Sequence, residues 1–174
     1  MTLFVIGYPE LSTADDEWIE DVRRQYDPQF ELIRSHFTLV FGMTDVDQHA
    51  AVDHVAGIAG WFGKVDFRIS RVFVDTANSE GAAFLYLVPE EGHESLYALH
   101  ERLNEGPLAG ARNHEASFVP HITIGRLDDP TEAQTQVSEL NQNGIDIAGT
   151  VRSLTVAQID EVGLEELATV ALAS

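Results

Sequence analysis

The sequence contains no cysteine. Disulfides, thiolate metal sites and thiol redox chemistry are therefore excluded, and a reducing compartment is a compatible location. Long apolar runs are also missing, since no segment approaches the roughly 18 residues that a membrane-spanning helix needs. The segment of residues 1–10 has no basic leader and only a short apolar run, which indicates a first strand rather than a signal peptide. We expect a cytoplasmic protein with no membrane partner.

Basic residues are scarce. Lys64 is the single lysine, and 10 lysines and arginines stand against 29 acidic residues, for a net charge of −19. This charge opposes the many phosphate contacts that long nucleic acid requires, so we expect no long nucleic acid as a partner. Any anionic ligand would have to meet a local basic patch, for which Arg68, Arg71 and Arg126 are candidates. We interpret the acidity itself mainly as a contribution to solubility.

The chain has 174 residues and is 44% hydrophobic, which suits one well-packed domain. Each half repeats one order of elements: helix, strand, helix, strand, strand. The expected helices cover residues 12–28, 46–62, 91–106 and 128–144, and the expected strands cover residues 2–9, 36–43, 64–76, 81–89, 119–126, 145–158 and 166–172. The repeat predicts an α+β fold in which a duplicated unit forms two lobes, residues 1–90 and 91–174, with strand exchange between them. We expect a monomeric domain with two antiparallel-rich sheets around a central cleft, related by a pseudo-twofold axis.

Two short strands carry the same pair of polar residues. His36 and Thr38 alternate with apolar residues in one strand, and His121 and Thr123 do so in another. Residues two apart in a strand share a face, so each pair points to the same side. One such pair is ordinarily structural, with a hydrogen-bonded histidine and a threonine chosen for its β-propensity. Two pairs in equivalent positions of a repeat indicate one shared site, with all four side chains facing a single cleft.

Two imidazoles and two hydroxyls in one cleft suit the hydrolysis of a phosphodiester. Histidine takes and gives protons near neutral pH, so one ring would act as general base and the other as general acid. Thr38 and Thr123 would donate hydrogen bonds to the phosphate oxygens as charge develops on them. The sequence leaves open which of His36 and His121 is the base. This chemistry requires no metal or other cofactor.

The sequence resembles the two-histidine phosphoesterase superfamily, in particular the bacterial 2′-5′ RNA ligase-like or RNA 2′,3′-cyclic phosphodiesterase proteins. The resemblance is carried by His36-Phe37-Thr38-Leu39, by Pro120-His121-Ile122-Thr123-Ile124, and by Arg126, which stands where many members have a basic residue. It implies a bilobal fold with a central cleft and cleavage of 2′,3′-cyclic or related phosphodiesters. The implied substrate is a small nucleotide or an RNA 3′ end with a cyclic phosphate. Many members have proline before the first histidine, whereas this chain has Ser35.

Four further residues are candidates for substrate binding. Arg126 follows Thr123 by three positions, so an ideal strand would point it to the other face, and a bulge would be needed to bring it to a phosphate. The alternative for Arg126 is a solvated side chain or an ion pair. Phe41, Phe118 and Tyr8 could stack on a base, and the alternative for each is a place in the core.

The remaining histidines give weak signals. His49 and Asp53 have the helical spacing of a metal-ligand pair, with His54 beside them, but a solvated helix face explains all three. We therefore predict no metal site. Three histidines without a pattern are expected at the surface or in loops: His93, His100 and His114.

Three functions are consistent with these features. The leading hypothesis is a metal-independent phosphodiesterase. The second is a non-catalytic protein that binds nucleotides or RNA ends, although simple binding would not need two titratable histidines. The third, metal-dependent hydrolysis through His49 and His54, has the weakest support.

Overall fold

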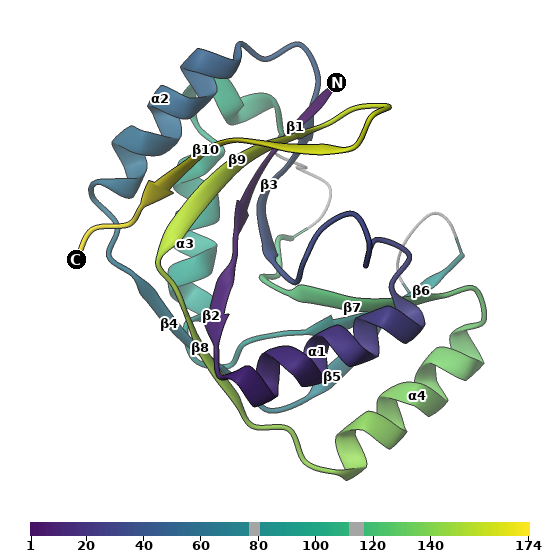
Figure 1. Cartoon of the computed structure of the whole chain (residues 1–174). Coiled ribbons are helices and arrows are strands. Elements are labelled where there is room, and N and C mark those ends of the chain that lie inside the picture. The colour runs from purple at the N-terminus through teal and green to yellow at the C-terminus, as the bar shows by residue number, and fades with distance from the viewer. Residues whose placement is uncertain (77–80, 112–116) are drawn as a thin grey trace.

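The computed structural model describes residues 1–76, 81–111 and 117–174 (Figure 1). The strands are β1 (Thr2–Gly7), β2 (Pro9–Leu11), β3 (Phe37–Met43), β4 (Val65–Ile69), β5 (Val72–Asp75), β6 (Ala83–Leu87), β7 (Ile122–Leu127), β8 (Ile147–Val151), β9 (Ser153–Ile159) and β10 (Leu164–Ala171). The helices are α1 (Thr13–Tyr26), α2 (Gln48–Ala59), α3 (His93–Leu103) and α4 (Pro130–Gln142), with a 3-10 helix η1 (Gly106–Ala111). The predicted α+β class with antiparallel sheets is confirmed.

Polar side chains cap the N-termini of two helices, α1 and α4. The side chain of Ser12 accepts a hydrogen bond from the backbone N–H of Asp15 and so caps α1. Asp129 caps α4 in the same way, and Pro130 occupies the first turn, where its missing N–H costs no helical hydrogen bond. Short polar caps therefore fix both helix starts.

Two antiparallel sheets organise the chain. The large sheet has the order β10-β9-β1-β3-β7-β6-β5, and the small sheet has the order β2-β8-β4. One edge of the large sheet combines the two halves of the chain, because β9 and β10 of the second half lie next to β1 of the first. The motif strands β3 and β7 are neighbours in its middle. The boundary of the two lobes near residue 90 stays a prediction.

Three predicted strands are each two strands in the structure. Residues 64–76 divide into β4 and β5, residues 145–158 divide into β8 and β9, and the N-terminal strand divides into β1 and β2. In each case the chain leaves one sheet and enters the other at the break. The apolar and β-branched pattern continues through each bend, so it marks the strands but not the change of sheet.

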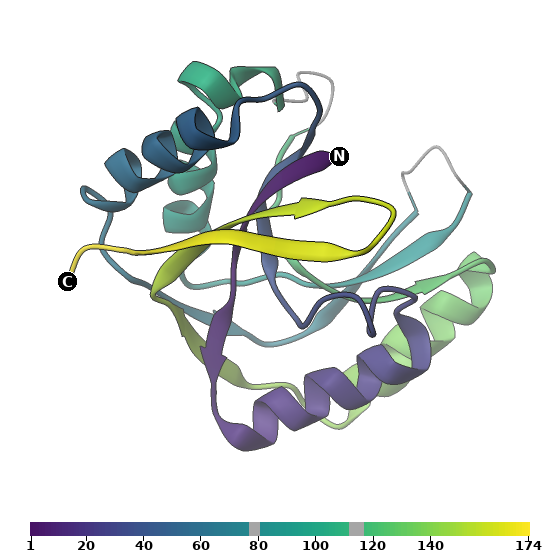
Figure 2. The same cartoon turned by 45° about the horizontal axis from the view of Figure 1, so that its top comes forward.

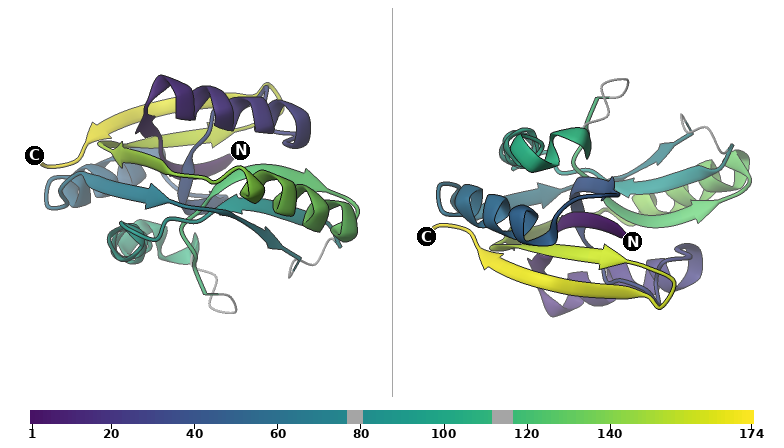
Figure 3. Two further views of the ribbon diagram at one scale, coloured as in Figure 1. Left: turned by 90° about the horizontal axis from the view of Figure 1, so that it is seen from below. Right: turned by 90° about the horizontal axis from the view of Figure 1, so that it is seen from above.

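Most of the contacts between helices and strands join segments that are distant in sequence. Helix α1 contacts β7, and α4 contacts β5, β6 and β7, whereas α2 contacts β9 and β10, and α3 contacts β3. Helices α1 and α4 lie next to each other (Figure 2), where the Tyr26 hydroxyl donates to Gln136 at 2.8 Å. Helix α1 lies so close to β7 that a Cβ on Gly125 would be 2.8 Å from Cβ of Tyr26. Viewed from above and below, the β9–β10 hairpin and α3 lie on opposite sides of the molecule (Figure 3).

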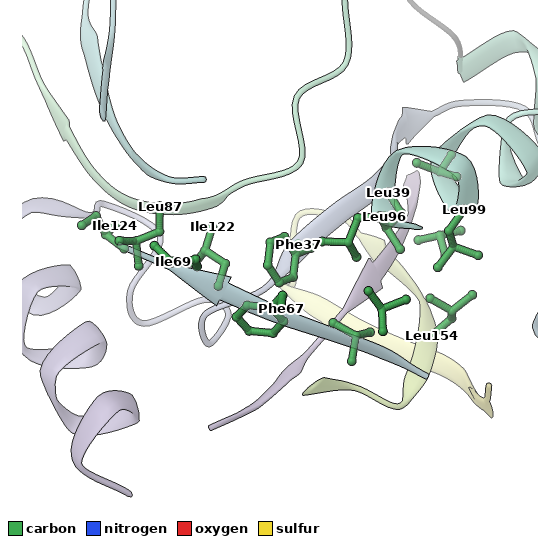
Figure 4. Packing of buried hydrophobic residues seen from close by; sticks show 14 of the residues in the cluster. Phe37, Leu39, Phe67, Ile69, Leu87, Leu96, Leu99, Ile122, Ile124 and Leu154 are labelled. Atoms are coloured by element: carbon green, nitrogen blue, oxygen red, sulfur yellow. The ribbon is translucent and has the colours of Figure 1, made fainter. Parts of the chain in front are cut away.

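The core lies beneath the two motif strands. Phe37 and Ile122 are both fully buried, and Phe37 meets Phe67 of β4 edge-on with ring centres 5.2 Å apart (Figure 4). Because alternate residues of a strand point to opposite faces, this packing turns the neighbouring histidines and threonines away from the core. Within the described residues, no helix has the length and apolar character needed to cross a membrane.

Candidate active site

The four motif side chains meet where β3 and β7 pair. Phe37 is paired with Ile122 in antiparallel register. The flanking residues therefore lie across from each other, His36 with Thr123 and Thr38 with His121. Directly opposite residues of an antiparallel pair have Cβ atoms about 4.5–5.5 Å apart. All four side chains are half-buried, so one face of the sheet, which we call the histidine face, carries two imidazoles and two hydroxyls.

Both imidazoles are oriented in the same way. Nδ1 of His36 lies 2.9 Å from the carbonyl oxygen of Arg34, and Nδ1 of His121 lies 2.7 Å from that of Val119. A carbonyl oxygen only accepts, so each Nδ1 carries a proton and donates it. Nε2 is then the nitrogen available for chemistry on each ring.

A buried ionic network holds the chain that leads into His36. The Arg23 guanidinium, 1% exposed, pairs with Glu20 at 2.9 Å and with Asp27 at 2.8 Å, and donates to the carbonyl of Ile33 at 2.6 Å. Glu20 also accepts from the backbone N–H of Ser35 at 2.9 Å. This network sits on α1 and fixes the two residues on either side of Arg34. The burial of Arg23 does not follow from a local helical pattern, because it depends on the returning loop.

A β-bulge follows the threonine in each motif. Between β1 and β3 the register passes from Val5–Val40 to Ile6–Thr38, so Leu39 is an extra residue. Between β6 and β7 it passes from Leu85–Gly125 to Tyr86–Thr123, so Ile124 is an extra residue. A bulge shifts the alternation of the strand by one.

The bulge at Ile124 decides the place of Arg126. Arg126 pairs with Phe84, and Phe84 shares a face with Tyr86, the partner of Thr123. Arg126 is therefore on the histidine face, half-buried, with Nη1 2.9 Å from Asp128. The bulge that Arg126 needs in order to share a face with Thr123 is therefore present. A contact of Arg126 with substrate stays a prediction.

Aromatic rings flank the two histidines. Tyr8 meets His36 edge-on with ring centres 6.5 Å apart, and its hydroxyl donates to Glu166 at 2.8 Å. Tyr86 stacks on His121 with ring centres 3.9 Å apart. The sequence indicated Tyr8 but missed Tyr86, which reaches the site through cross-strand pairing rather than through any motif. Burial raises the pKa of Tyr86 to about 12, with a smaller contribution from Asp75, so this hydroxyl stays protonated.

Phe41 and Phe118 belong to a ring cluster with α3. Their ring centres are 6.3 Å apart, and Phe118 stacks on His100 at 3.7 Å. Phe118 also packs against the main core, which agrees with the core alternative. Their contact with a base stays a prediction.

The expectation for His100 is wrong. This residue is 6% exposed on α3, and its Nδ1 bonds the carbonyl of Leu39 at 2.8 Å, while Asn104 donates to the same oxygen at 3.1 Å. The bulge at Leu39 takes this carbonyl out of the regular ladder, which explains why two buried side chains satisfy it. His93 is half-buried at the start of α3, and His114 lies outside the described residues.

The electrostatic surroundings of the two histidines differ. Burial lowers the pKa of both rings below the usual histidine value. For His36, the nearby Arg23 and His121 lower the pKa further, partly offset by the Arg34 carbonyl and Asp27. For His121, the Val119 carbonyl and the Asp75 carboxylate both oppose the effect of burial. The nearby charges therefore favour the protonated form of His121 more than that of His36.

The residues weighed for a metal site lie on α2. His49 and Asp53 are exposed, and Nε2 of His54 bonds the carbonyl of Leu103 at 3.1 Å. In the part of the chain that the structure describes, no three His, Asp or Glu side chains form a group that could hold a metal. Arg68 of the expected basic patch pairs with Asp146 at 2.7 Å in the small sheet, away from Arg126 in the large one.

The sequence profile of the 2′-5′ RNA ligase superfamily matches residues 10–163. The chain belongs to this superfamily. The predicted relationship to the two-histidine phosphoesterases is thereby confirmed, and the protein is a phosphoesterase of that group. The relatives that match include proteins named "Putative phosphoesterase". The protein of Bacillus pumilus is 30% identical over 74% of this chain and 73% of its own, and that of Geobacillus sp. is 31% identical over 78% and 76%.

Solved structures of superfamily members have the same fold. TT0787 of Thermus thermophilus aligns with a TM-score of 0.68 at 13% identity, covering 99% of this chain and 98% of its own. E. coli LigT in complex with 3′-AMP aligns with a TM-score of 0.57 at 16% identity and the same coverage. LigT has also been solved with ATP and with NADP+.

Proposed function

We propose that the protein is a metal-independent phosphodiesterase that hydrolyses 2′,3′-cyclic or related phosphodiesters of nucleotides or RNA ends. The observation that carries the proposal is the pairing of Phe37 with Ile122, which sets His36 across from Thr123 and Thr38 across from His121. Two imidazoles whose Nδ1 atoms are both engaged leave two Nε2 atoms for a base and an acid.

His36 acts as the base and His121 as the acid. Nε2 of His36 takes a proton from water, and the water oxygen forms a bond to phosphorus. The bond from phosphorus to the departing ribose oxygen breaks, and Nε2–H of His121 gives that oxygen its proton. The charges support this assignment, since Arg23 disfavours a second cation at His36, while Asp75 and the stacked Tyr86 favour imidazolium at His121. Proton exchange with solvent restores the starting state.

The hydroxyls of Thr38 and Thr123 bind the non-bridging phosphate oxygens, where negative charge develops. Arg126 supplies a positive charge on the same face, because the bulge at Ile124 turns it there. A cation at this position stabilises a phosphate that gains charge during the reaction.

A small or terminal nucleotide is the proposed substrate. The net charge of −19 disfavours long nucleic acid, and the complexes of LigT with 3′-AMP, ATP and NADP+ support a nucleotide ligand for this fold. The proposal includes action as a monomer in the cytoplasm, which size-exclusion chromatography and cell fractionation test.

The deciding experiment is a substrate panel with identified products. It comprises 2′,3′-cyclic nucleotides, 2′-5′-linked dinucleotides and ADP-ribose cyclic phosphate, each with and without excess chelator. We expect the cyclic phosphodiesters to be opened to a single phosphomonoester, at the same rate with chelator. Binding without turnover would support the non-catalytic alternative, and loss of activity with chelator that returns with added metal would overturn metal independence.

The pH profile gives a second test. The free enzyme should show a bell-shaped kcat/KM, because one ring must be neutral and the other protonated. Since burial lowers the pKa of both rings, the maximum should lie below the usual histidine pKa of about 6.5. A flat profile from about pH 5 to 9 would count against the paired roles.

A further inference from the structure

Among the residues that the structure describes, two arginines lack a carboxylate partner. Every other lysine and arginine of the described residues pairs with an aspartate or glutamate, whereas Arg34 and Arg71 do not. Each of these two instead lies over an aromatic ring, Arg34 over Tyr8 at 3.7 Å and Arg71 over Phe73 at 4.3 Å. In a protein of net charge −19, a cation left without a counter-ion is available to an anionic ligand.

Of these two arginines, Arg34 lies beside His36, one of the two candidate catalytic histidines. Its carbonyl accepts the Nδ1–H of His36 at 2.9 Å, and its side chain is exposed. A single tyrosine ring separates the guanidinium from the imidazole, since Tyr8 contacts both. Arg71 is farther from the histidines, because Phe73 pairs with Tyr86 and Tyr86 stacks on His121.

The guanidinium of Arg34 is held in place before any ligand arrives. Tyr8 is 8% exposed, and its hydroxyl donates to Glu166 at 2.8 Å, so the ring is a fixed support. Stacking covers one face of the guanidinium and leaves its N–H edges for a phosphate, which arginine binds through two parallel hydrogen bonds. Glu166, which holds the Tyr8 hydroxyl, forms no ion pair with Arg34.

We propose that Arg34, supported by Tyr8, binds the internucleotide phosphate next to the scissile phosphodiester, so that the preferred substrate is an oligonucleotide 3′ end rather than a cyclic mononucleotide. The inference rests on the proposed function and narrows its substrate class. The Tyr8 ring centre lies 6.5 Å from that of His36 and 3.7 Å from the Arg34 guanidinium, so a phosphate bound to Arg34 would lie near one held at His36. Arg34 supplies one phosphate contact, which fits a short oligonucleotide end, whereas the overall charge of the protein still disfavours long nucleic acid.

The test compares two substrates that differ by one nucleotide and therefore by one internucleotide phosphate. Uridine 2′,3′-cyclic phosphate has only the scissile phosphate, and the dinucleotide UpU ending in a 2′,3′-cyclic phosphate has one more. We expect the wild type to prefer the dinucleotide in kcat/KM. Arg34→Gln should reduce that preference about tenfold or more, as for loss of a charge-assisted hydrogen bond, and leave the cyclic mononucleotide unaffected. Arg71→Gln, which removes the other unpaired arginine, should keep the preference.

Several outcomes would overturn the inference. These are a wild type without preference, an Arg34→Gln variant that loses both activities equally and so acts through His36, and a preference lost in Arg71→Gln instead. Binding of the products separates this result from the proposed function. If no substrate is hydrolysed, tighter binding of UpU 3′-phosphate than of 3′-UMP, lost in Arg34→Gln, would still support the phosphate site. Equal binding of the two products would overturn it.

Discussion

The two motif strands share one geometry, and different contacts hold it in each. In β3 and β7 the residue after the threonine is the extra residue of a bulge, and Nδ1 of each histidine bonds the carbonyl two positions earlier. Before His121 stands the buried Pro120, whose ring restricts the backbone. Before His36 stands Ser35, whose N–H donates to Glu20. A rigid proline backbone therefore positions the chain before His121, and a buried ionic network positions the chain before His36.

The aromatic neighbours differ in the same way. His121 has Tyr86 stacked on its face at 3.9 Å, whereas His36 meets Tyr8 edge-on at 6.5 Å, with Arg34 above that ring. The two strands thus present equivalent Nε2 atoms in unlike surroundings, and this difference is the basis for the opposite proton-transfer roles proposed for His36 and His121.

The largest effect should follow removal of either histidine. His36→Ala and His121→Ala should each lower kcat by about 10²- to 10⁴-fold, since general acid–base catalysis contributes that much. His36→Ala should also remove the acidic limb of the pH profile and His121→Ala the basic limb. Circular dichroism serves as the control for folding. A single variant with near-wild-type turnover would rule out the mechanism, and exchanged limbs would reverse the roles.

Loss of either hydroxyl should cost less. Thr38→Ala and Thr123→Ala should lower kcat by roughly 10- to 10³-fold, as expected when one donor to a developing charge is removed. The matched variants Thr38→Ser and Thr123→Ser keep the hydroxyl and should retain most of the activity. Unchanged kinetics in both alanine variants would mean that the hydroxyls do not contact the phosphate.

The contrast between the strands also shows what a sequence can predict. The two motifs, the helix starts and the antiparallel α+β class follow from local patterns, because alternation and capping act within a few residues. The burial of Arg23 and His100 does not, because each satisfies backbone groups of a segment distant in sequence. The bulge at Ile124 that places Arg126 depends on register between strands, which a single strand pattern does not encode.

A smaller effect should follow when the residue before His36 is replaced by proline, the residue that precedes His121. Ser35→Pro removes the N–H that donates to Glu20, and a hydrogen bond to a charged group contributes about 1.5–3 kcal/mol, so the free energy of unfolding should fall by about that amount. Urea denaturation measures it. Ser35→Ala keeps the N–H and should change stability little.

A double-mutant cycle isolates this hydrogen bond. In a Glu20→Ala background the acceptor is absent, so Ser35→Pro should cost clearly less than in the wild type. An undiminished cost would show that the proline acts through backbone geometry instead, and that Glu20 does not hold the lead-in of His36.

The smallest effect should come from the ring stacked on His121. Tyr86→Leu keeps an apolar side chain but removes the aromatic face that favours imidazolium, so the pKa of His121 should fall. The basic limb of kcat/KM should move about 0.5 pH unit lower, while the acidic limb, which belongs mainly to His36, should stay in place. Tyr86→Phe retains the stacked face and is the matched control, with both limbs near their wild-type positions. A shift of the acidic limb alone in Tyr86→Leu would mean that His121 is the base, and no shift in either limb would mean that the stacked ring does not influence proton transfer.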